Sequence, residues 1–259
     1  MAETIRKLND SHVEAFNVEY VSDKLWEVLI FQLEKLTAVE DKDFNFLDIG
    51  GGNGIFTDRI LAHYPKSSGV LIDNSKYLLS KNSENPRKTV IETSAENLTG
   101  AIRNEKFDII FMNWFLHHCV TDSFSDTLAM QRKMLAQAHQ LLTDDGNLVV
   151  FENLPDGYLG EKTCSYIINR ITSNKLLAPV VKKLGANTAG IGVCFLGEKQ
   201  WSKQFSKTNF SVSGLKKFPN WKLNPIKKLF LTLKNMRVGL FFLTKNDTSS
   251  EKYYNPSER

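Results

Sequence analysis

The chain has 259 residues, of which 42% are hydrophobic and 24% are charged, a composition ordinary for a soluble globular protein with one sizeable core. Its longest apolar runs, such as residues 238–243, are far too short to cross a bilayer, and the first residues lack the apolar region of a signal peptide. We therefore expect a cytoplasmic protein without a membrane span. The cysteines Cys119, Cys164 and Cys194 are scattered, which predicts neither a metal site nor a disulfide framework and fits a reducing compartment.

Positive charge is concentrated towards the C-terminal end. Residues 198–245 contain eleven basic residues and one acidic residue, a net charge of +10, which leaves −6 for the rest of a chain whose formal net charge is +4. A basic stretch of this kind hints at an acceptor that is anionic or carrier-bound. A solvated basic face is the simpler interpretation.

The first 40 residues are expected to form a helical cap, because the apolar residues of 21–36 recur near helical spacing. From residue 45 onward, short apolar runs alternate with helical patterns, the signature of repeated βα units and a parallel sheet. The expected strands are 45–49, 69–72, 89–92, 107–112 and 147–151, and the expected helices are 55–63, 75–81 and 125–142. Residues 143–146, Thr-Asp-Asp-Gly, predict a turn into the last of these strands.

The alternation lapses after residue 152. Residues 153–197 contain a proline, several glycines and a helical middle at 165–184, and they are expected to be an insertion. Because long insertions at ligand faces often form lids, we expect this segment and the N-terminal cap to cover the acceptor.

The last part of the chain returns to regular elements. The expected order is a crossover helix at 201–207, a strand at 210–217, a short basic helix capped by Asn224 and Pro225, and a strand at 237–243. We expect residues 1–245 to form a single domain and the polar tail, 246–259, to be disordered.

The strongest motif is Asp48-Ile49-Gly50-Gly51-Gly52-Asn53-Gly54, which follows an expected strand and opens an expected helix. Glycine permits positive φ and removes the side chain, so a ligand can lie against the backbone. The following helix presents its N-terminal amide groups to that ligand.

Two common nucleotide motifs do not fit this loop. The dinucleotide fingerprint G-x-G-x-x-G would place its last glycine at Ile55 or Thr57, and a P-loop would end in Gly-Lys-Ser/Thr, for which no lysine is present. The pattern instead resembles motif I of the class I S-adenosylmethionine-dependent methyltransferases, in which an acidic residue precedes G-x-G-x-G. That cofactor carries ammonium and sulfonium centres, so an acid such as Asp48 beside the loop is chemically sensible.

The resemblance extends over residues 45–152 and implies the fold. Members have an α/β architecture, a doubly wound, mostly parallel seven-stranded sheet with helices on both faces, in which the last strand runs antiparallel. Asp73 at the end of the second strand would accept the ribose hydroxyls. Ser94 stands where the family often has an aspartate that contacts the adenine amino group. The implied cofactor-binding residues are Asp48, Gly50, Gly51, Gly52, Asn53, Gly54, Asp73, Asn74, Ser94, Ala95 and Asn113.

The fourth strand is followed by Leu116-His117-His118, which looks like the post-strand segment of many small-molecule methyltransferases. An imidazole suits general-base work near neutral pH, and packing in the wall of the site is the alternative for each histidine. We favour His118, because its position matches the single histidine of family members that have Glu-His there. His117 is the comparison, because adjacent residues generally do not face the same pocket. Glu152 at the next strand end is expected to orient a histidine or to hold a cationic amine.

Aromatic residues are expected to line the acceptor pocket, namely Phe16, Tyr20, Trp114, Tyr158 and Tyr166. Asn113 lacks the Pro-Pro-aromatic context of enzymes that methylate base nitrogens, which argues against DNA as a partner. No acidic cluster has the spacing of a hard-metal site, so no metal is expected.

The expected function is methyl transfer from S-adenosylmethionine to O, N or C of a small-molecule metabolite. The sequence leaves three alternatives open: a cofactor-binding protein without methyl transfer, a cyclase-like enzyme, and a protein or RNA methyltransferase. It leaves the acceptor atom and the oligomeric state open as well.

Overall fold

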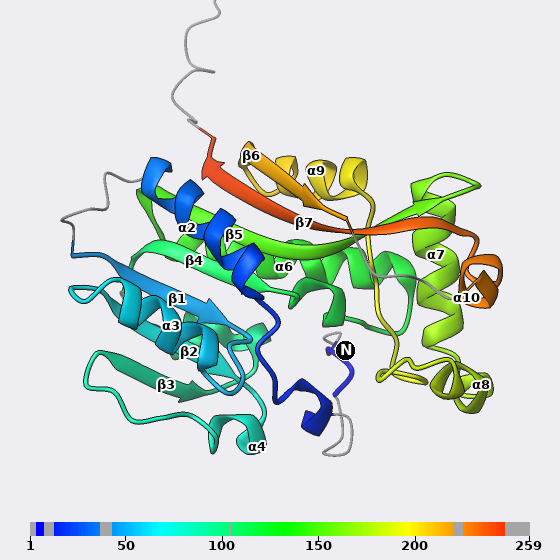
Figure 1. Cartoon of the computed structure of the whole chain (residues 1–259), viewed down its shortest axis with the longest axis horizontal. Coiled ribbons are helices and arrows are strands. Elements are labelled where there is room, and N and C mark those ends of the chain that lie inside the picture. Colours follow the sequence, from blue (N-terminus) through cyan, green and yellow to red (C-terminus); the bar gives the residue numbers. More distant parts are fainter. Residues whose placement is uncertain (1–3, 8–12, 37–42, 104, 220–224, 247–259) are drawn as a thin grey trace, which may run out of the picture.

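The computed structural model describes residues 4–7, 13–36, 43–103, 105–219 and 225–246. Asn224 and residues 247–259 of the expected tail lie outside the described residues. A seven-stranded sheet in the order β3-β2-β1-β4-β5-β7-β6 forms the centre of the molecule (Figure 1). Its strands are β1 (Asn45–Ile49), β2 (Ser68–Asp73), β3 (Lys88–Glu92), β4 (Phe107–Asn113), β5 (Leu142–Gly157), β6 (Phe210–Phe218) and β7 (Leu233–Lys245).

The direction of the strands confirms the expected doubly wound fold. Strands β1 to β5 pair parallel with one another, whereas β7 pairs antiparallel with both β5 and β6. The chain builds outward from β1 to β3 and then returns to place β4 on the other side of β1. This reversal leaves a crevice beyond the carboxyl ends of β1 and β4, where open α/β sheets bind their ligands.

Helices cover both faces of the sheet. They are α2 (Asp23–Leu36), α3 (Ile55–His63), α4 (Lys76–Leu79), α5 (Leu98–Ala101), α6 (Phe124–Leu141), α7 (Glu161–Thr172), α8 (Ala178–Lys183), α9 (Glu198–Ser206) and α10 (Pro225–Phe230). Short 3-10 turns add η1 (Glu14–Phe16), η3 (Ala95–Asn97) and η4 (Leu116–His118). Every helix in the described ranges is too short or too polar to cross a lipid bilayer.

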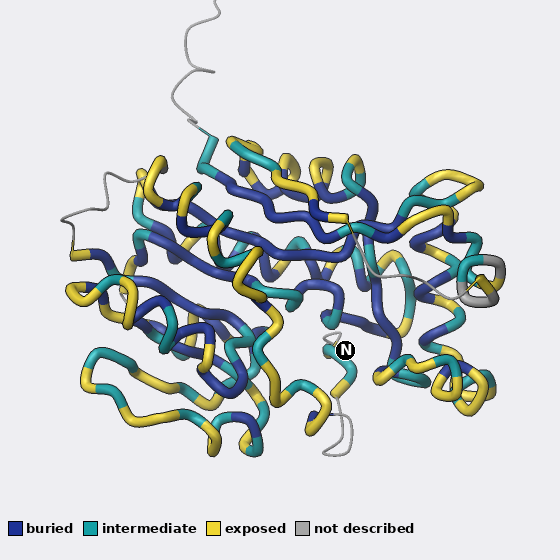
Figure 2. The backbone as a smooth tube through the Cα atoms, in the orientation of Figure 1, coloured by how far each residue is buried: buried dark blue, intermediate teal, exposed yellow. Residues whose placement is uncertain are grey.

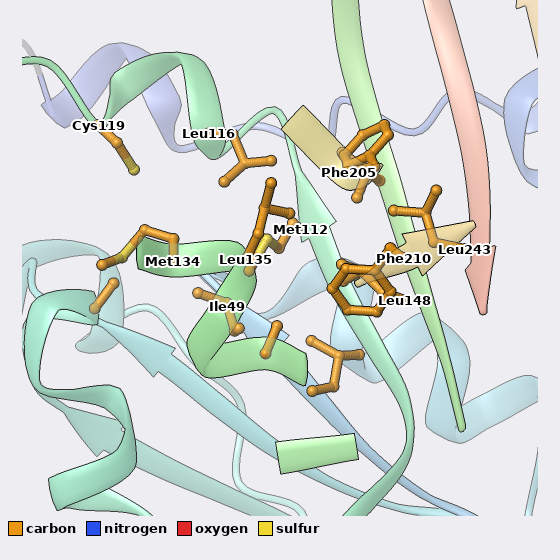
Figure 3. Packing of buried hydrophobic residues seen from close by; sticks show 14 of the residues in the cluster. Ile49, Met112, Leu116, Cys119, Met134, Leu135, Leu148, Phe205, Phe210 and Leu243 are labelled. Atoms are coloured by element: carbon orange, nitrogen blue, oxygen red, sulfur yellow. The ribbon is translucent and has the colours of Figure 1, made fainter. Parts of the chain in front are cut away.

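Alternation along the strands divides the core into two layers. In β4, Ile110 and Met112 pack with α5, α6 and α9, whereas Ile109 and Phe111 pack with α2 and α3. Figure 3 shows the first layer, in which Met112 lies close to Met134 and Leu135 of α6. The inner strands are the most continuously buried segments of the chain, whereas the edge strands β3 and β6 are largely exposed (Figure 2).

Strand β5 is longer at both ends than the expected 147–151. Residues 143–146, expected as a turn, belong to the strand, and the β4–β5 register shifts between Phe107 and Ile109. The irregularity accommodates turn-type residues within a paired strand. At the other end, Pro155 is tolerated because β4 has already ended at Asn113, which leaves one side of β5 without a neighbouring strand.

Candidate cofactor and acceptor site

A cavity of about 1190 Å³ opens at the carboxyl ends of β1, β2 and β4. Residues from the glycine loop, the loops after β2, β3 and β4, the N-terminal segment and the 153–197 insertion all line it. Of the expected cofactor-binding residues, the lining includes Asp48, Gly50, Gly51, Gly52, Asn53, Asp73, Asn74, Ser94, Ala95 and Asn113. The loops that follow parallel strands therefore bring together residues that are far apart in the sequence.

The glycine loop adopts backbone conformations that other residues rarely reach. The φ angles of Gly50, Gly52 and Gly54 are 76°, 53° and 76°. A Cβ atom on Gly50 would lie 2.6 Å from Cδ2 of Phe115, so this side of the loop has no room for a side chain. Gly54 does not line the cavity and caps α3 from behind the loop, where a Cβ atom would collide with Asn82.

Asp48 lies beneath the loop and is buried. One of its oxygens, Oδ2, accepts a hydrogen bond of 2.7 Å from the hydroxyl of Thr57, a residue that the sequence analysis did not single out. Burial, together with the nearby acids Glu19 and Asp73, raises the pKa of Asp48 to about 7 despite the hydrogen bond from Thr57, which lowers it. A cation placed against Asp48 would relieve this cost of burial.

Asp73 reaches back from the end of β2 to the glycine loop. Its Oδ2 accepts a hydrogen bond of 3.1 Å from the backbone N–H of Gly52, and its Oδ1 accepts one of 2.8 Å from Ser75 N–H. Burial raises the pKa of Asp73, and these backbone donors oppose the shift. The carboxylate thus faces the cavity at a fixed position beside the loop.

The end of β3 is tied to the N-terminal segment through Glu96. The Ser94 hydroxyl donates a hydrogen bond of 2.8 Å to Oε2 of Glu96, and the backbone N–H of Ile5 donates one of 2.6 Å to Oε1. The Ser94 oxygen accepts a long hydrogen bond of 3.4 Å from the backbone N–H of Glu96, which leaves it one lone pair for a ligand. Glu96 was not singled out in the sequence, because its role depends on a residue 91 positions away.

Asn113, the last residue of β4, has both of its side-chain amide atoms buried, and neither has a hydrogen-bond partner among the described residues. Buried polar groups are normally paired, and an unpaired amide that lines a cavity is a ready donor and acceptor for a ligand.

His117 is bonded twice to Glu152 at the end of the neighbouring strand. Its backbone N–H donates to Oε1 at 3.1 Å, and its Nδ1 lies 2.8 Å from Oε2. Burial raises the pKa of Glu152 to about 8 and lowers that of His117 to about 3. Both directions favour the pair with a protonated carboxyl group and a neutral imidazole at neutral pH.

Both histidines line the cavity, so the expectation that only one of them would face it is corrected. The 3-10 turn η4 has about three residues per turn, and its tight winding brings the two rings to a centroid distance of 4.1 Å. Glu152 contacts His117, whereas the ring of His118 packs against the edge of Phe16 at 5.2 Å. Burial also lowers the pKa of His118 well below its ordinary value.

Three of the five aromatic residues expected at the acceptor line the cavity: Phe16, Tyr20 and Trp114. Trp114 stacks on Phe151 with a centroid distance of 5.0 Å and donates from Nε1 to Asn153 Oδ1 at 3.3 Å. The other two, Tyr158 and Tyr166, are 70% and 47% exposed and lie outside the cavity wall.

The N-terminal segment forms a strap over the site, held by Arg6. The Arg6 guanidinium donates to the carbonyl of Ile191 in the insertion at 3.1 Å and pairs with Asp122 at 3.3 Å, while its backbone N–H donates to Val120 O at 2.8 Å. Asn17 adds a second tie, because its Oδ1 accepts from Asn53 of the glycine loop at 3.1 Å. No pattern in the sequence singled out Arg6.

Acidic and sulfur-bearing side chains do not gather into a metal centre. Within the described ranges, no three or more His, Cys, Asp or Glu side chains are arranged to hold a metal ion. The three cysteines are buried free thiols.

Residues 47–148 match the family model described as "Methyltransferase domain". The chain is 32% identical over 114 residues to the "Ribosomal RNA large subunit methyltransferase G" of Psychromonas ingrahamii, a match covering 41% of this chain and 29% of that protein. It is 31% identical over 86 residues to the "Malonyl-[acyl-carrier protein] O-methyltransferase 1" of Ilyobacter polytropus, covering 32% of this chain and 31% of that protein. The matched segments thus span less than a third of either relative.

Solved structures extend the likeness to the whole fold. The cyclopropane synthase MmaA2 from Mycobacterium tuberculosis aligns over 92% of this chain and 95% of its own, with a TM-score of 0.56 and 18% identity. The [4+2]-cyclase SpnF aligns over 86% and 82%, with a TM-score of 0.58 and 12% identity. LepI, solved in complex with SAM, aligns over 84% and 46%, with a TM-score of 0.53 and 13% identity. At these identities the likeness shows the fold alone.

The matched segment begins inside β1, just before the glycine loop, and ends inside β5, so it contains the loops after β1, β2, β3 and β4 that line the cavity. The family model, the doubly wound sheet with its antiparallel β7 and the glycine loop agree on one assignment. Residues 47–148 form the core of a class I S-adenosylmethionine-dependent methyltransferase domain, as the sequence motifs predicted.

Proposed function

We propose that this protein transfers a methyl group from S-adenosylmethionine to an oxygen, nitrogen or carbon atom of a small-molecule metabolite. The observation that carries the proposal is one continuous cavity that joins the glycine loop and Asp73 to the two histidines under a roof made by the strap and the insertion. Such a roof admits a small acceptor more readily than a nucleic-acid strand. A cytoplasmic location and a single domain over 1–245 stay predictions.

S-adenosylmethionine is the cofactor, and the residues of the site fit its chemistry. Gly50 and Gly52 present backbone with positive φ to the cavity, and Asp73 can accept from two ribose hydroxyls. Asp48 and the unpaired amide of Asn113 would hold the charged amino-acid end of the cofactor. When bound, S-adenosylmethionine supplies a methyl group whose carbon–sulfur bond breaks with its electron pair left on sulfur.

The residues of the chain would contribute mainly position and a proton acceptor. Holding the acceptor in line with the breaking bond removes much of the entropic barrier. When the acceptor is a hydroxyl or a protonated amine, a neutral imidazole nitrogen of His118 takes the proton as the acceptor's lone pair bonds to the methyl carbon. The pair of His117 and Glu152 fixes the turn that carries His118.

RNA is the second candidate acceptor, favoured by the ribosomal RNA methyltransferase relative and by the basic stretch. Lys199, Lys203 and Lys207 recur every four residues along α9 and its end, and all three are exposed. They do not line the cavity, so an RNA bound there would need to reach the site from outside the roof.

Two measurements test the proposal in order. Calorimetry with S-adenosylmethionine, S-adenosylhomocysteine and NAD should show micromolar or tighter binding of the first two, at least about 8 kcal/mol, and none of NAD. Methyl-labelled cofactor is then incubated with a small-metabolite pool and, separately, with total RNA. Label in the metabolites supports the proposal and label in RNA supports the second candidate. Cofactor binding without any transfer would favour a non-methylating protein, such as a cyclase-like enzyme.

A further inference from the structure

Strands β5 and β7 continue past the end of β4, and this overhang carries one end of the cavity. β4 stops at Asn113 opposite Phe151, whereas β5 and β7 stay paired as far as Gly157 and Leu233. Helices α7, α8 and α10 gather at this end of the molecule, opposite the end that carries β3 (Figure 1). The cavity therefore extends well beyond the cofactor loops.

The part of the cavity under the insertion, here called the apolar arm, is lined by hydrophobic side chains. They include Ile171, Val181, Leu184, Phe195, Leu233 and Met236. Among the side chains that the structure describes, none of the lining residues in 168–195 and 230–238 carries a charge. The basic residues of α7 and α8 are exposed instead, namely Lys162, Arg170, Lys182 and Lys183.

Most charged lining residues lie at the other end of the same cavity, beside the glycine loop, namely Glu19, Asp48, Asp73, Lys76 and Glu92. Arg6 and Lys7 belong to the strap, and the Arg6 guanidinium, which reaches Ile191 at the border of the arm, is already paired with Asp122. The total volume of about 1190 Å³ also exceeds the roughly 300–1000 Å³ typical of a site for one small ligand. The cavity thus offers a polar part for the cofactor, an apolar arm for a second molecule, and a junction between them at Asn113 and His118.

We propose that the methyl acceptor has an uncharged apolar body that fills the apolar arm, with its accepting atom at the junction. This inference rests on the proposed function, of which it names the acceptor class. A carboxylate or ammonium group that enters the arm would lose its hydration and meet no free counter-charge there. Apolar contacts do not offset this loss of hydration free energy. The anionic acceptor hinted at by the basic stretch is therefore not the molecule that the arm would select.

The test compares three probes of one chain length, decan-1-ol, decanoate and decylammonium, by displacement of the neutral dye Nile red at pH 7. Measurements are made with and without saturating S-adenosylhomocysteine. Decan-1-ol should bind at least tenfold more tightly than either ion. The inference is overturned when either ion binds as tightly as the alcohol, or when Nile red does not bind.

Substitutions at Ile171, a half-buried residue of the arm, test whether the selectivity among the probes arises in the arm. Ile171→Asp should weaken the binding of decan-1-ol at least tenfold, and Ile171→Asn should weaken it less. Ile171→Lys should raise the affinity for decanoate relative to the alcohol. Leu176→Asp is the matched control, because Leu176 is 90% exposed and lies outside the cavity wall. Equal effects at both positions would overturn the assignment of the arm.

Calorimetry with S-adenosylhomocysteine on the same proteins keeps the two proposals apart. Normal cofactor binding without selectivity among the probes refutes the apolar arm and leaves the proposed function standing. Selectivity among the probes without cofactor binding refutes the proposed function and leaves the arm standing.

Discussion

His117 and Glu152 are joined by two hydrogen bonds. The backbone N–H of His117 donates to Oε1 of Glu152 at 3.1 Å, and Nδ1 of His117 lies 2.8 Å from Oε2. Glu152 lies in β5 and is fully buried, with 0% exposure. His117 lies in η4, the 3-10 turn that follows β4. The pair therefore locks the turn after β4 to the neighbouring strand, at the point where the cofactor part of the cavity meets the apolar arm.

The state of this pair can be tested by stability. Because burial favours a protonated Glu152, Glu152→Gln preserves both the acceptor for His117 N–H and a donor towards Nδ1. We expect Glu152→Gln to lower the free energy of unfolding by less than about 1 kcal/mol. Glu152→Ala leaves two buried polar atoms unpaired and should lower it by about 2–4 kcal/mol. Urea unfolding measures both. Equal losses in the two variants would show that the carboxyl group is ionised in the native protein.

The same pair predicts a dependence of stability on pH. The pKa of Glu152 is raised to about 8, so the folded state holds a proton that the unfolded state releases above about pH 4.5, and stability falls as the pH rises towards 8. The pKa of His117 is lowered to about 3, so its contribution falls as the pH drops from about 6.5 to 3. The two slopes oppose each other between pH 4.5 and 6.5.

Above pH 6.5 the opposing slope of His117 has ended, and Glu152 lowers the free energy of unfolding by at most about 1.4 kcal/mol per pH unit. The free energy of unfolding should therefore decline between pH 6.5 and 8 in the wild-type protein, and this decline should shrink in Glu152→Gln. Asp48, with its pKa raised to about 7, adds to the decline in both proteins and cancels in the difference. Identical pH profiles would refute the raised pKa of Glu152.

Asp73 should govern affinity for the cofactor. Asp73→Ala removes a charged acceptor and also frees the N–H groups of Gly52 and Ser75, so we expect S-adenosylhomocysteine to bind more weakly by about 1.5–3 kcal/mol or more. Asp73→Asn keeps one acceptor oxygen and should therefore lose less affinity for S-adenosylhomocysteine than Asp73→Ala does. Calorimetry measures both, with Glu84→Ala as an exposed acidic control. Unchanged affinity in both Asp73 variants would contradict the role assigned to the end of β2.

Two glycines with similar φ angles separate strain from contact. Gly50 and Gly160 have φ angles of 76° and 86°, but a Cβ atom would meet Phe115 at Gly50 and nothing within 4 Å at Gly160. Gly160, whose ψ angle is 159°, lies in a region that is essentially restricted to glycine, so Gly160→Ala should lower stability by the strain alone, about 1–3 kcal/mol, and leave cofactor binding intact. Gly50→Ala should in addition displace the loop and lower the affinity for S-adenosylhomocysteine at least tenfold. Equal cofactor affinity in the two variants would mean that the glycine loop can shift to accommodate the added methyl group without weakening cofactor binding.

Much of the fold was predictable because its signals are local. Strand β1 and helix α3 have the expected bounds, since an apolar run and a glycine loop determine them within about 20 residues. The gathering of the implied cofactor residues other than Gly54 in one cavity wall was predictable for the same reason, because each lies at or shortly after the end of a strand. The extension of β5 beyond β4 was not predictable from the sequence, because Pro155 indicates that the strand ends there. Only the partner strand β7, some 80 residues later, shows that the pairing continues.

The acceptor end depends on contacts between distant segments. Arg6 meets Ile191 across 185 residues, and the pairing of Glu152 with His117 rather than His118 depends on the winding of a three-residue turn. Tyr158 and Tyr166 are of the right type and in the right segment, yet they lie outside the cavity wall, because residue type alone does not fix which face of α7 or its preceding loop points inward.

The remaining prediction concerns proton transfer once an acceptor is known. His118 lines the cavity, contacts Phe16 and has a pKa held below its ordinary value by burial, so it is neutral at working pH. We expect His118→Ala to lower kcat about 10²–10⁴-fold with cofactor affinity nearly unchanged. The wild-type rate should stay constant as the pH falls through 6.5, because the imidazole stays unprotonated there.

Two comparisons decide whether His118 acts as a base or only fills space. His118→Asn keeps a polar group but cannot take the proton, so it should be as slow as His118→Ala if proton transfer limits the rate. His117→Ala instead leaves Glu152 without its partner, so it should lower the free energy of unfolding and affect kcat less than the His118 variants do. The Nδ1 atom of His117 is already engaged by Glu152, so it is not free to take a proton from the acceptor. Near-normal turnover in the His118 and His117 variants alike would show that positioning of the acceptor alone carries the reaction.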